Sequence, residues 1–396
     1  PLAAPRRRGG GGGGGRRFAV VTAATDEYFA RGALVTLHSA GLHLKRRRRQ
    51  PQAGAREEGP RGADAVDGAD ATGDDDDDVD LVLLTLAGAG LPEGWRKRFA
   101  ALGARVEEVP QVLPSPAVRA AMQADRGKLE QQGLLEVLQP VPYGGAFLKV
   151  HAWDPGLFGG YEKVVLLDGD VVAKRSIRGL LRMRPISASG DLLDAFNYGV
   201  VVLRPDAGIH SGLVRLLSEA SPQDIARYSA RKANEAGFCD QTLVAGFLAA
   251  HHGPVDFFED LREASRADPR GWLLSTEYNF VVSYRATERC EDPKERRRVD
   301  KARIVHFANN WINFGALALD RDAPGRIDSP RCYRGAFRYW HDVHYHALAL
   351  TAEASWMIAE AGQSCVEACG SAGCLEDYWP TSRDDFELAL AQLGGG

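Results

Sequence analysis

Short apolar runs alternate with longer amphipathic segments along the first third of the chain. The runs at 18–24 ("FAVVTAA"), 79–87 ("VDLVLLTLA") and 104–109 ("ARVEEV") have the length and the Val and Leu content of strands. Apolar positions at helical spacing follow the first two runs, in residues 26–44 and 92–103. This order of strand, helix, strand, helix and strand is typical of a parallel sheet covered on both faces, so the predicted class is α/β with a mostly parallel central sheet.

The same alternation continues to about residue 307. It predicts, in chain order, a helix at 146–153, a strand in "YEKVVLLDGDVV" (161–172), a strand at 198–205, helices near 207–220 and 239–250, and a strand at 302–307.

Composition divides the chain into parts. Residues 1–17 are rich in Gly and Arg and are predicted to be disordered. Residues 18–320 form one α/β domain, interrupted at 45–79 by a charge-rich, low-complexity insertion. Residues 321–396, rich in aromatic residues and Cys, are predicted to be a small C-terminal extension.

Charge and hydropathy exclude some function classes. The 396 residues carry a net charge of only −4, because "KRRRR" (45–49) and "DDDDD" (74–78) nearly cancel. No aromatic residues interleave with the basic run, so we expect no nucleic-acid partner. No apolar run is long enough to cross a bilayer. Because the chain begins at Pro1 and not at Met, a membrane anchor outside it stays open.

Two carboxylates, Asp168 and Asp170, follow a buried strand directly. Asp-Gly is a common turn dipeptide, so an acidic turn is the simplest interpretation. The alternative is a metal site, because two aspartates one residue apart can both reach a hard divalent cation, which can in turn hold a diphosphate.

Two other motifs are weaker indications of function. Gly88, Gly90 and Gly94 resemble a dinucleotide-binding loop, which would make the protein an NAD(P)-dependent oxidoreductase. However, the third glycine comes one place late, and Pro92 stands where the backbone should approach the pyrophosphate, so a plain strand-to-helix turn is favoured. The histidines of "WHDVHYH" (340–346) are predicted to lie on a polar helix face.

Five segments occur together in an order that resembles glycosyltransferase family 8, the glycogenin-like and galactinol-synthase-like enzymes, which include plant-type glucuronosyltransferases. They are "VVTAATDEYFARGALV" (20–35), "FLKVHAW" (147–153), "VVLLDGDVV" (164–172), "DAFNYGVVVLRP" (194–205) with "GFCDQTLV" (237–244), and "ARIVHF" (302–307). The resemblance implies a nucleotide-sugar-binding fold of the GT-A type. It also implies Mn²⁺ and the transfer of a hexosyl or glucuronosyl unit, with retention, from a UDP-sugar to a hydroxyl of a glycan, lipid or protein.

The resemblance assigns roles to the carboxylates and to their surroundings. Asp168, Asp170 and His306 would bind Mn²⁺, and imidazole with carboxylates suits this ion better than Mg²⁺. Lys149 matches the family lysine that faces the donor.

Further residues would bind the donor or take part in the reaction. In the family, the first strand-to-helix loop holds uridine, and open α/β sheets bind ligands at such loops. The residues expected at the nucleotide or sugar are Thr22, Thr25, Asp26, Tyr28, Asp194 and Gly199, and the expected catalytic residues are Lys149, Asn197, Asp240 and Gln241. Phe29 fits the base-stacking role as well as Tyr28. Retention by a nucleophilic Asp240 and retention by exchange on one face of the sugar both stay open.

One departure from the family bears on activity. The segment after His306 reads "HFANNWINF", with Asn309 and Ile312 where the family has a glycine and a diphosphate-binding lysine. A catalytically silent relative that binds nucleotide or glycan is therefore an alternative to an active enzyme.

The cysteines suggest a compartment. Three of the six lie in "CVEACGSAGC" (365–374), a spacing that favours a disulfide-linked tail over a zinc site. The expected location is the Golgi or another secretory lumen, with the cytoplasm as the alternative.

Overall fold

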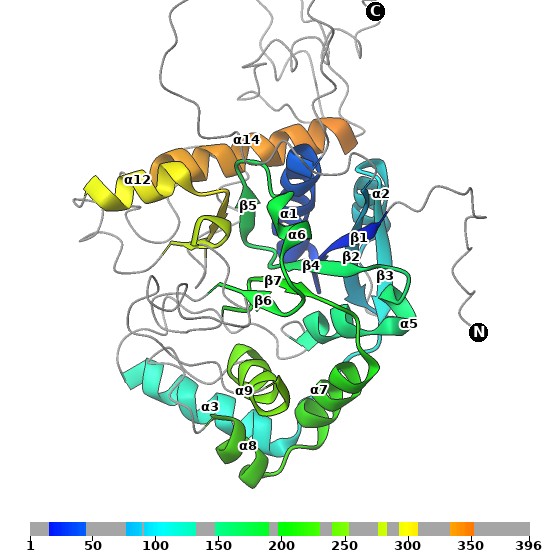
Figure 1. The fold of residues 1–396 in the computed structure, drawn as a ribbon, viewed down its shortest axis with the longest axis vertical. Coiled ribbons are helices and arrows are strands. Elements are labelled where there is room, and N and C mark those ends of the chain that lie inside the picture. The colour runs from blue at the N-terminus through cyan, green and yellow to red at the C-terminus, as the bar shows by residue number, and fades with distance from the viewer. Residues whose placement is uncertain are drawn as a thin grey trace, which may run out of the picture.

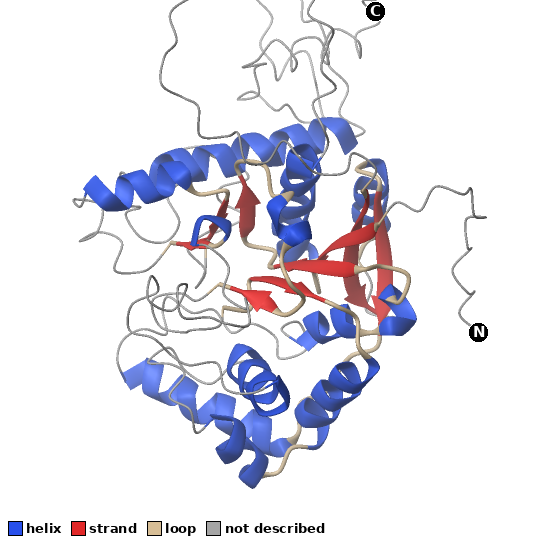
Figure 2. Cartoon of the chain, in the orientation of Figure 1, coloured by secondary structure: helices blue, strands red, loops and turns tan. Residues whose placement is uncertain are grey.

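The computed structural model describes nine segments of the chain, and they form layers of helices above and below a central sheet (Figures 1 and 2). The described residues are 16–44, 77–88, 91–131, 147–189, 197–229, 240–252, 276–282, 293–307 and 333–351.

The central sheet has six strands in the order β3-β2-β1-β4-β7-β6. Their bounds are β1 Arg17–Ala23, β2 Asp78–Leu86, β3 Ala104–Val109, β4 Lys163–Leu167, β6 Ser187–Ala188 and β7 Val200–Leu203. Strands β3, β2, β1 and β4 run parallel to one another, whereas β7 is antiparallel to both β4 and β6. The predicted α/β class and mostly parallel sheet are therefore confirmed.

Alternation along β1 explains why the sheet needs cover on both faces. Phe18 and Val20 pack into one hydrophobic cluster with α1, while Ala19 and Val21 pack into another on the opposite face. All four side chains are fully buried. Successive residues of a strand point to opposite faces, so an all-apolar strand has to be central.

Helices supply that cover. One side of the main sheet is covered by α1 (Glu27–Leu44), α2 (Glu93–Ala101), α6 (Gly179–Arg182), α12 (Pro293–Lys301) and α14 (Arg334–Thr351) (Figure 1). The other side is covered by α3 (Pro116–Gln131), η2 (Phe147–Trp153), α5 (Pro155–Phe158), α7 (Ala207–Glu219), α8 (Pro222–Ser229) and α9 (Asp240–His252). The predicted helix at 146–153 is thus a 3-10 helix, η2, over residues 147–153.

A second, small sheet has the order β5-β9-β8. Its strands are β5 (Val171–Ala173), β8 (Phe280–Val281, after η3 at Thr276–Tyr278) and β9 (Ile304–His306). The strand predicted in 161–172 is β4, which ends before Asp168 as expected, whereas β5 after the turn was not predicted and belongs to the other sheet. The chain changes sheet at the Asp168–Asp170 turn.

The start of the predicted C-terminal extension lies against the α/β body. Tyr333, Phe337 and Trp340 form a buried cluster with Val305 and Phe307 of the second sheet, and α14 packs against both α1 and α2. The boundary at residue 320 stays a prediction, and Cys332, Cys365, Cys369 and Cys374 lie outside the described residues.

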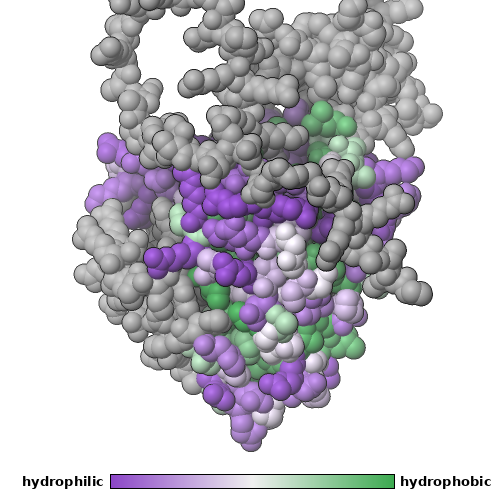
Figure 3. Space-filling model, turned by 45° about the vertical axis from the view of Figure 1, so that its right-hand side comes forward, coloured by the Kyte–Doolittle hydropathy of each residue, from purple (hydrophilic) through white to green (hydrophobic). Residues whose placement is uncertain are grey.

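The described surface has few exposed large apolar side chains, namely Leu42, Leu113 and Leu350. On the face in Figure 3, hydrophilic residues cover much of the coloured surface and separate the hydrophobic patches. Within the described residues, no helix has the length and apolar content to span a bilayer.

Two of the three histidines predicted to lie on a polar helix face are instead buried. His341 and His344 of α14 are 4% and 2% exposed, and none of their ring nitrogens has a hydrogen-bond partner among the described residues. Burial, together with the smaller effects of the nearby Arg31, His341 and Arg98, lowers the pKa of His344 to about 3. His344 is therefore neutral in the folded protein at pH 7.

This buried histidine predicts a loss of stability in acid. Between pH 6.5 and about 3 the unfolded chain binds a proton at residue 344 that the folded chain does not, so the free energy of unfolding should fall by about 1.4 kcal/mol per pH unit from this group. Urea unfolding of the wild type and of His344→Phe at pH 4 to 7 measures the difference in slope. Equal slopes in the two proteins would contradict the prediction.

Candidate functional site

The Asp168–Asp170 turn lies where the chain leaves β4 for β5. Strand β9 pairs antiparallel with β5, so that His306 lies opposite Val171. The backbone N–H of Phe307 donates to the carbonyl of Asp170, 2.9 Å. This pairing brings three predicted metal ligands together: His306 Nε2 is 3.2 Å from Asp170 Oδ1 and 3.9 Å from Asp168 Oδ2. One ligand atom from each residue lies within 4.8 Å of the others.

Helix α1 holds the turn in place. Thr36 Oγ1 donates to the carbonyls of Asp168 and Val171, at 3.1 and 2.9 Å. Ser39 Oγ accepts from the N–H of Ala173, 3.0 Å. Gly169 lies close to the helix, since an added Cβ would be 3.6 Å from Ala33 N. The position of the two carboxylates is therefore set by the helix that follows β1.

A chain of hydrogen bonds fixes the tautomer of His306. The N–H of Gly199 can only donate, and it donates to Asn197 Oδ1, 2.9 Å. Asn279 Nδ2 donates to the same oxygen, 2.9 Å, which leaves Asn279 Oδ1 as an acceptor. This oxygen lies 3.0 Å from His306 Nδ1, so Nδ1 carries the proton of the neutral ring.

In the neutral ring the nitrogen without a proton is Nε2, and it faces two carboxylates. Asp170 Oδ1 is buried and accepts no hydrogen bond from the described residues. A lone pair and two carboxylates in one place repel each other unless a cation lies between them. A metal-binding histidine commonly donates its other ring N–H to a carbonyl oxygen, as His306 does here. These residues fit a divalent transition-metal ion.

Lys149 of η2 supplies one positive charge at the edge of this cluster. Its Nζ donates to Asp168 Oδ1, 2.9 Å, and lies 4.8 Å from the ring centre of Tyr198. Burial raises the pKa of Asp168; Lys149 opposes this shift, Asp170 adds to it, and His306 opposes it when its ring is protonated. One lysine therefore does not offset the burial and mutual repulsion of the two carboxylates.

Gly199 is required by the His306 ring. An added Cβ would lie 2.2 Å from His306 Cε1 and 2.7 Å from Nδ1. From the sequence, Gly199 was expected to leave room for the sugar. In the structure, its close neighbour is the imidazole of His306.

The predicted uridine loop lies beside the cluster. Thr22 is buried at the end of β1, and its Oγ1 has no hydrogen-bond partner among the described residues. Asp26 caps α1, because its Oδ1 accepts from the N–H of Phe29, 3.1 Å, and Thr25 Oγ1 donates to its Oδ2, 3.3 Å. Tyr28 packs edge-on against Phe29. An added Cβ on Gly169 would lie 3.7 Å from the carbonyl oxygen of Ala23, so the turn adjoins this loop.

The predicted sugar-end residues are placed in part. Gln241 Oε1 accepts from the N–H of Tyr198, 2.8 Å, which joins the start of α9 to the segment that carries Asn197. Asp240 is the first residue of α9, but its side chain lies outside the described part of the chain. Asp194, Asn309, Ile312 and Gly90 also lie outside it.

Two residues of the site were not predicted. Thr36 lies in the apolar pattern of α1, and Asn279 stands in "TEYNF" (276–280) with no periodic sequence around it. Their hydrogen bonds join segments 27 to 135 residues apart. No local pattern marks such partners.

Comparisons with known proteins give structural likenesses only. No protein-family model matches the chain, and no curated protein matches it. Among solved structures, the glycosyltransferase GlyE of Streptococcus pneumoniae is 14% identical, with a TM-score of 0.40, over 83% of this chain. The galactosyltransferase LgtC, solved with donor and acceptor sugar analogs, is 14% identical, with a TM-score of 0.37, over 83% of this chain and 95% of its own. Mouse xyloside xylosyltransferase 1 is 12% identical, with a TM-score of 0.38, over 74% of this chain and 98% of its own.

The chain spans 63% of the length of GlyE. Because all three TM-scores are below 0.5, the function has to be argued from the residues of the site.

The hydrogen-bond chain predicts the protonation of His306. In ¹⁵N-labelled, metal-free protein at neutral pH, the His306 ring should show a protonated Nδ1. Asn279→Ala removes the acceptor, so the ring should shift toward the Nε2–H tautomer, while the signals of the other histidines stay in place. Two-bond ¹H–¹⁵N correlation spectra measure both states. A wild-type ring protonated on Nε2 alone would contradict the assignment.

Proposed function

We propose that the protein is a glycosyltransferase that moves a hexosyl or glucuronosyl unit from a UDP-sugar to a hydroxyl of a glycan, lipid or protein, with retention and with dependence on Mn²⁺. One observation carries the proposal. Asp168, Asp170 and the bare Nε2 of His306 converge at the carboxyl edge of a mostly parallel sheet, beside the first strand-to-helix loop. Ligands of open α/β sheets bind at this edge.

The three ligands suit Mn²⁺ and a nucleotide diphosphate. Imidazole nitrogen with carboxylate oxygens is a donor set that Mn²⁺ accepts, whereas Mg²⁺ prefers oxygen alone. When bound, the ion would neutralise the charge that develops on the diphosphate leaving group. Asp168 and Asp170 hold the pair of charges that such an ion needs, and Thr36 keeps their turn in place.

Lys149 would hold the diphosphate from the side of η2. Its ammonium group lies against Asp168 and over the ring of Tyr198, and its side chain is 14% exposed. It is thus already held at the edge of the cluster, where its hydrogen bond to Asp168 could be replaced by one to a phosphate oxygen. This role matters more because Ile312 stands where the family has a second lysine.

The loop after β1 would bind the nucleoside. Asp26 is exposed, so one of its oxygens can accept from a ribose or base donor while the other caps α1. Thr22 brings a buried hydroxyl without a partner among the described residues to the end of the same strand. Tyr28, or its neighbour Phe29, offers an aromatic face for the base.

The sugar would lie toward Asn197 and the start of α9, with Asp194 and Gly199 from the same segment near it. Gln241 is anchored to the N–H of Tyr198, next to Asn197. Asp240 precedes it and would lie beside the anomeric carbon. It acts either as the nucleophile or as a charge that supports exchange on one face of the sugar, with a diphosphate oxygen taking the acceptor proton.

A silent relative that binds nucleotide without turnover is the second candidate, favoured by Asn309 and Ile312 in "HFANNWINF". The Golgi or another secretory lumen stays the expected location because of the Cys-rich tail.

The metal ligands generate the first test. Asp168→Asn and Asp170→Asn should each weaken Mn²⁺ binding in the presence of UDP by about 100-fold or more, because each removes a charged ligand. His306→Ala should weaken it as well and leave the fold intact, since β9 remains apolar. Calorimetric titration of Mn²⁺ measures the affinities, with the exposed Asp78→Asn as the matched control. Unchanged Mn²⁺ affinity in both aspartate variants would reduce the turn to an acidic loop.

A second test separates an enzyme from a silent relative. A panel of UDP-sugars with Mn²⁺ should reveal hydrolysis or transfer with at least one donor. Asp240→Asn should then lower turnover by about 100-fold, which is about 2.7 kcal/mol of transition-state stabilisation, and spare UDP affinity. Asn also caps helices well, so α9 should still form. Normal turnover with weak UDP binding would move Asp240 out of the catalytic role, and metal-dependent UDP binding without turnover of any donor would favour the silent relative.

A further inference from the structure

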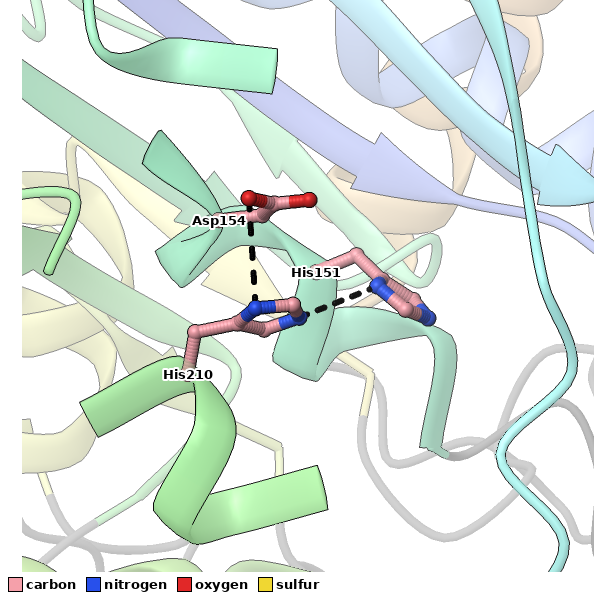
Figure 4. Close-up of side chains that lie close together, drawn as sticks. All are labelled: His151, Asp154 and His210. Atoms are coloured by element: carbon pink, nitrogen blue, oxygen red, sulfur yellow. Dashed lines mark hydrogen bonds and ion pairs between the residues drawn. The ribbon is translucent and has the colours of Figure 1, made fainter. Parts of the chain in front are cut away.

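A second group of metal-ligating side chains lies on the other side of η2. His151 belongs to η2, Asp154 follows this helix and caps α5, and His210 lies in the first turns of α7. The three side chains point toward one another (Figure 4). The N–H of Asp206, the residue that caps α7, donates to the carbonyl of Trp153, 2.9 Å, so the backbone itself holds the two helices together here.

The protons of this group can be assigned from its neighbours. His151 Nε2 lies 2.9 Å from the carbonyl oxygen of Pro110, which can only accept, so the neutral ring carries its proton there. His151 Nδ1 is therefore bare, and it faces His210 Nε2 at 3.2 Å. Asp154 Oδ1 accepts from the N–H of Gly156, 2.7 Å, and lies 3.9 Å from His210 Nδ1, too far for a hydrogen bond.

This arrangement has the features of a metal site. One ligand atom from each of the three residues lies within 4.8 Å of the others. Two nitrogens bound to one tetrahedral Zn²⁺ are separated by about 3.3 Å, given Zn–N bonds of about 2.05 Å, and the two rings here approach to 3.2 Å. Burial lowers the pKa of His151 and of His210, which favours the neutral rings that metal ligation requires. The bond from His151 to a backbone carbonyl is the usual outer contact of a metal-bound histidine.

We propose that His151, Asp154 and His210 form a second metal site, which binds a zinc-type divalent ion through one nitrogen of each ring and a carboxylate oxygen. Two nitrogens and one oxygen favour Zn²⁺, Co²⁺ or Cu²⁺ over Mn²⁺. His151 is buried, but His210 and Asp154 are partly exposed, so the ion can be reached from solvent and can take a water as fourth ligand.

Such an ion would link η2 to α7. Lys149, two residues before His151 on η2, reaches the Asp168 cluster. Lys149 and His151, two residues apart on η2, therefore contact two different clusters, whose ligands favour different ions. The second site is independent of the proposed transferase reaction, since it shares no ligand with the first.

Cobalt titration of the full chain tests the proposal. The metal-free protein carries Asp168→Asn and Asp170→Asn, which removes the first cluster. One equivalent of Co²⁺ should then give visible d–d absorption without the near-ultraviolet charge-transfer band of thiolate ligands, which excludes the cysteines. Excess Zn²⁺ should abolish the spectrum, and the same excess of Mn²⁺ should leave it in place.

Variants identify the ligands. Adding His210→Gln should weaken Co²⁺ binding by about 10-fold to 100-fold or abolish it, while glutamine keeps an N–H that can donate to His151. Asp154→Asn should also weaken binding and preserve the cap of α5, because Asn caps helices as well as Asp. His251→Gln, an exposed histidine of α9, is the matched control and should change nothing.

Thermal unfolding gives a readout that does not depend on the spectrum. Zn²⁺ should raise the Tm of the protein that lacks the first cluster, and it should not raise the Tm once His210→Gln is added. A protein that shows no cobalt absorption and no Zn²⁺ effect on Tm would overturn the proposal and leave a histidine pair that shares a proton. Unchanged Co²⁺ affinity in both ligand variants would overturn it as well.

Discussion

The structure around the first cluster depends on one electrostatic constraint: two carboxylates and an imidazole lone pair are held facing one another in a partly buried place. Asp168 and Asp170 cannot move apart, because Thr36 binds the backbone of their turn. His306 cannot turn its proton toward them while Asn279 accepts from its Nδ1. Such an arrangement costs stability unless a cation binds, so we interpret it as a preorganised cation site.

The sheet arrangement creates this constraint. Strand β4 belongs to the main sheet and β5 to the small one, so the turn between them has to cross the gap between two sheets. Strand β7 borders the turn on one side, through the bond from the N–H of Asp168 to the carbonyl of Gly199, 2.8 Å. Strand β9 borders it on the other side through β5. Gly199 completes the fit, because any side chain there would occupy the place of the His306 ring.

The sequence predicted what depends on local patterns. Apolar runs located β1, β2, β3, β4, β7 and β9, and apolar positions at helical spacing located α1, α2, α7 and α9, since burial leaves a local pattern. Helix α3, which follows β3, was not predicted. Asp168 and Asp170 were found because polar residues that close an apolar strand are conspicuous, whereas His306 was assigned through the resemblance to a family. Lys149 and Gln241 came from the resemblance to a family, and the structure places both near the cluster.

Contacts between segments that are far apart in the sequence produce no such local pattern. The short strand β5 was not predicted, because its three residues after the turn are too few to show a pattern. Asn279 and Thr36 act through partners far away in the chain. His344 was expected on a polar face, but tertiary packing of α14 against α1 buries it. His151, Asp154 and His210 lie in three separate elements, and their approach follows from the packing of η2 on α7.

The proposed function depends most on one ion that binds between His306 and the two aspartates together with a nucleotide diphosphate. Pulsed electron paramagnetic resonance of Mn²⁺ bound with UDP tests it directly. The account predicts a ¹⁴N coupling from one directly bound imidazole, absent in His306→Ala, together with ³¹P couplings from the diphosphate. A Mn²⁺ signal with phosphorus couplings but no imidazole nitrogen in the wild type would contradict it.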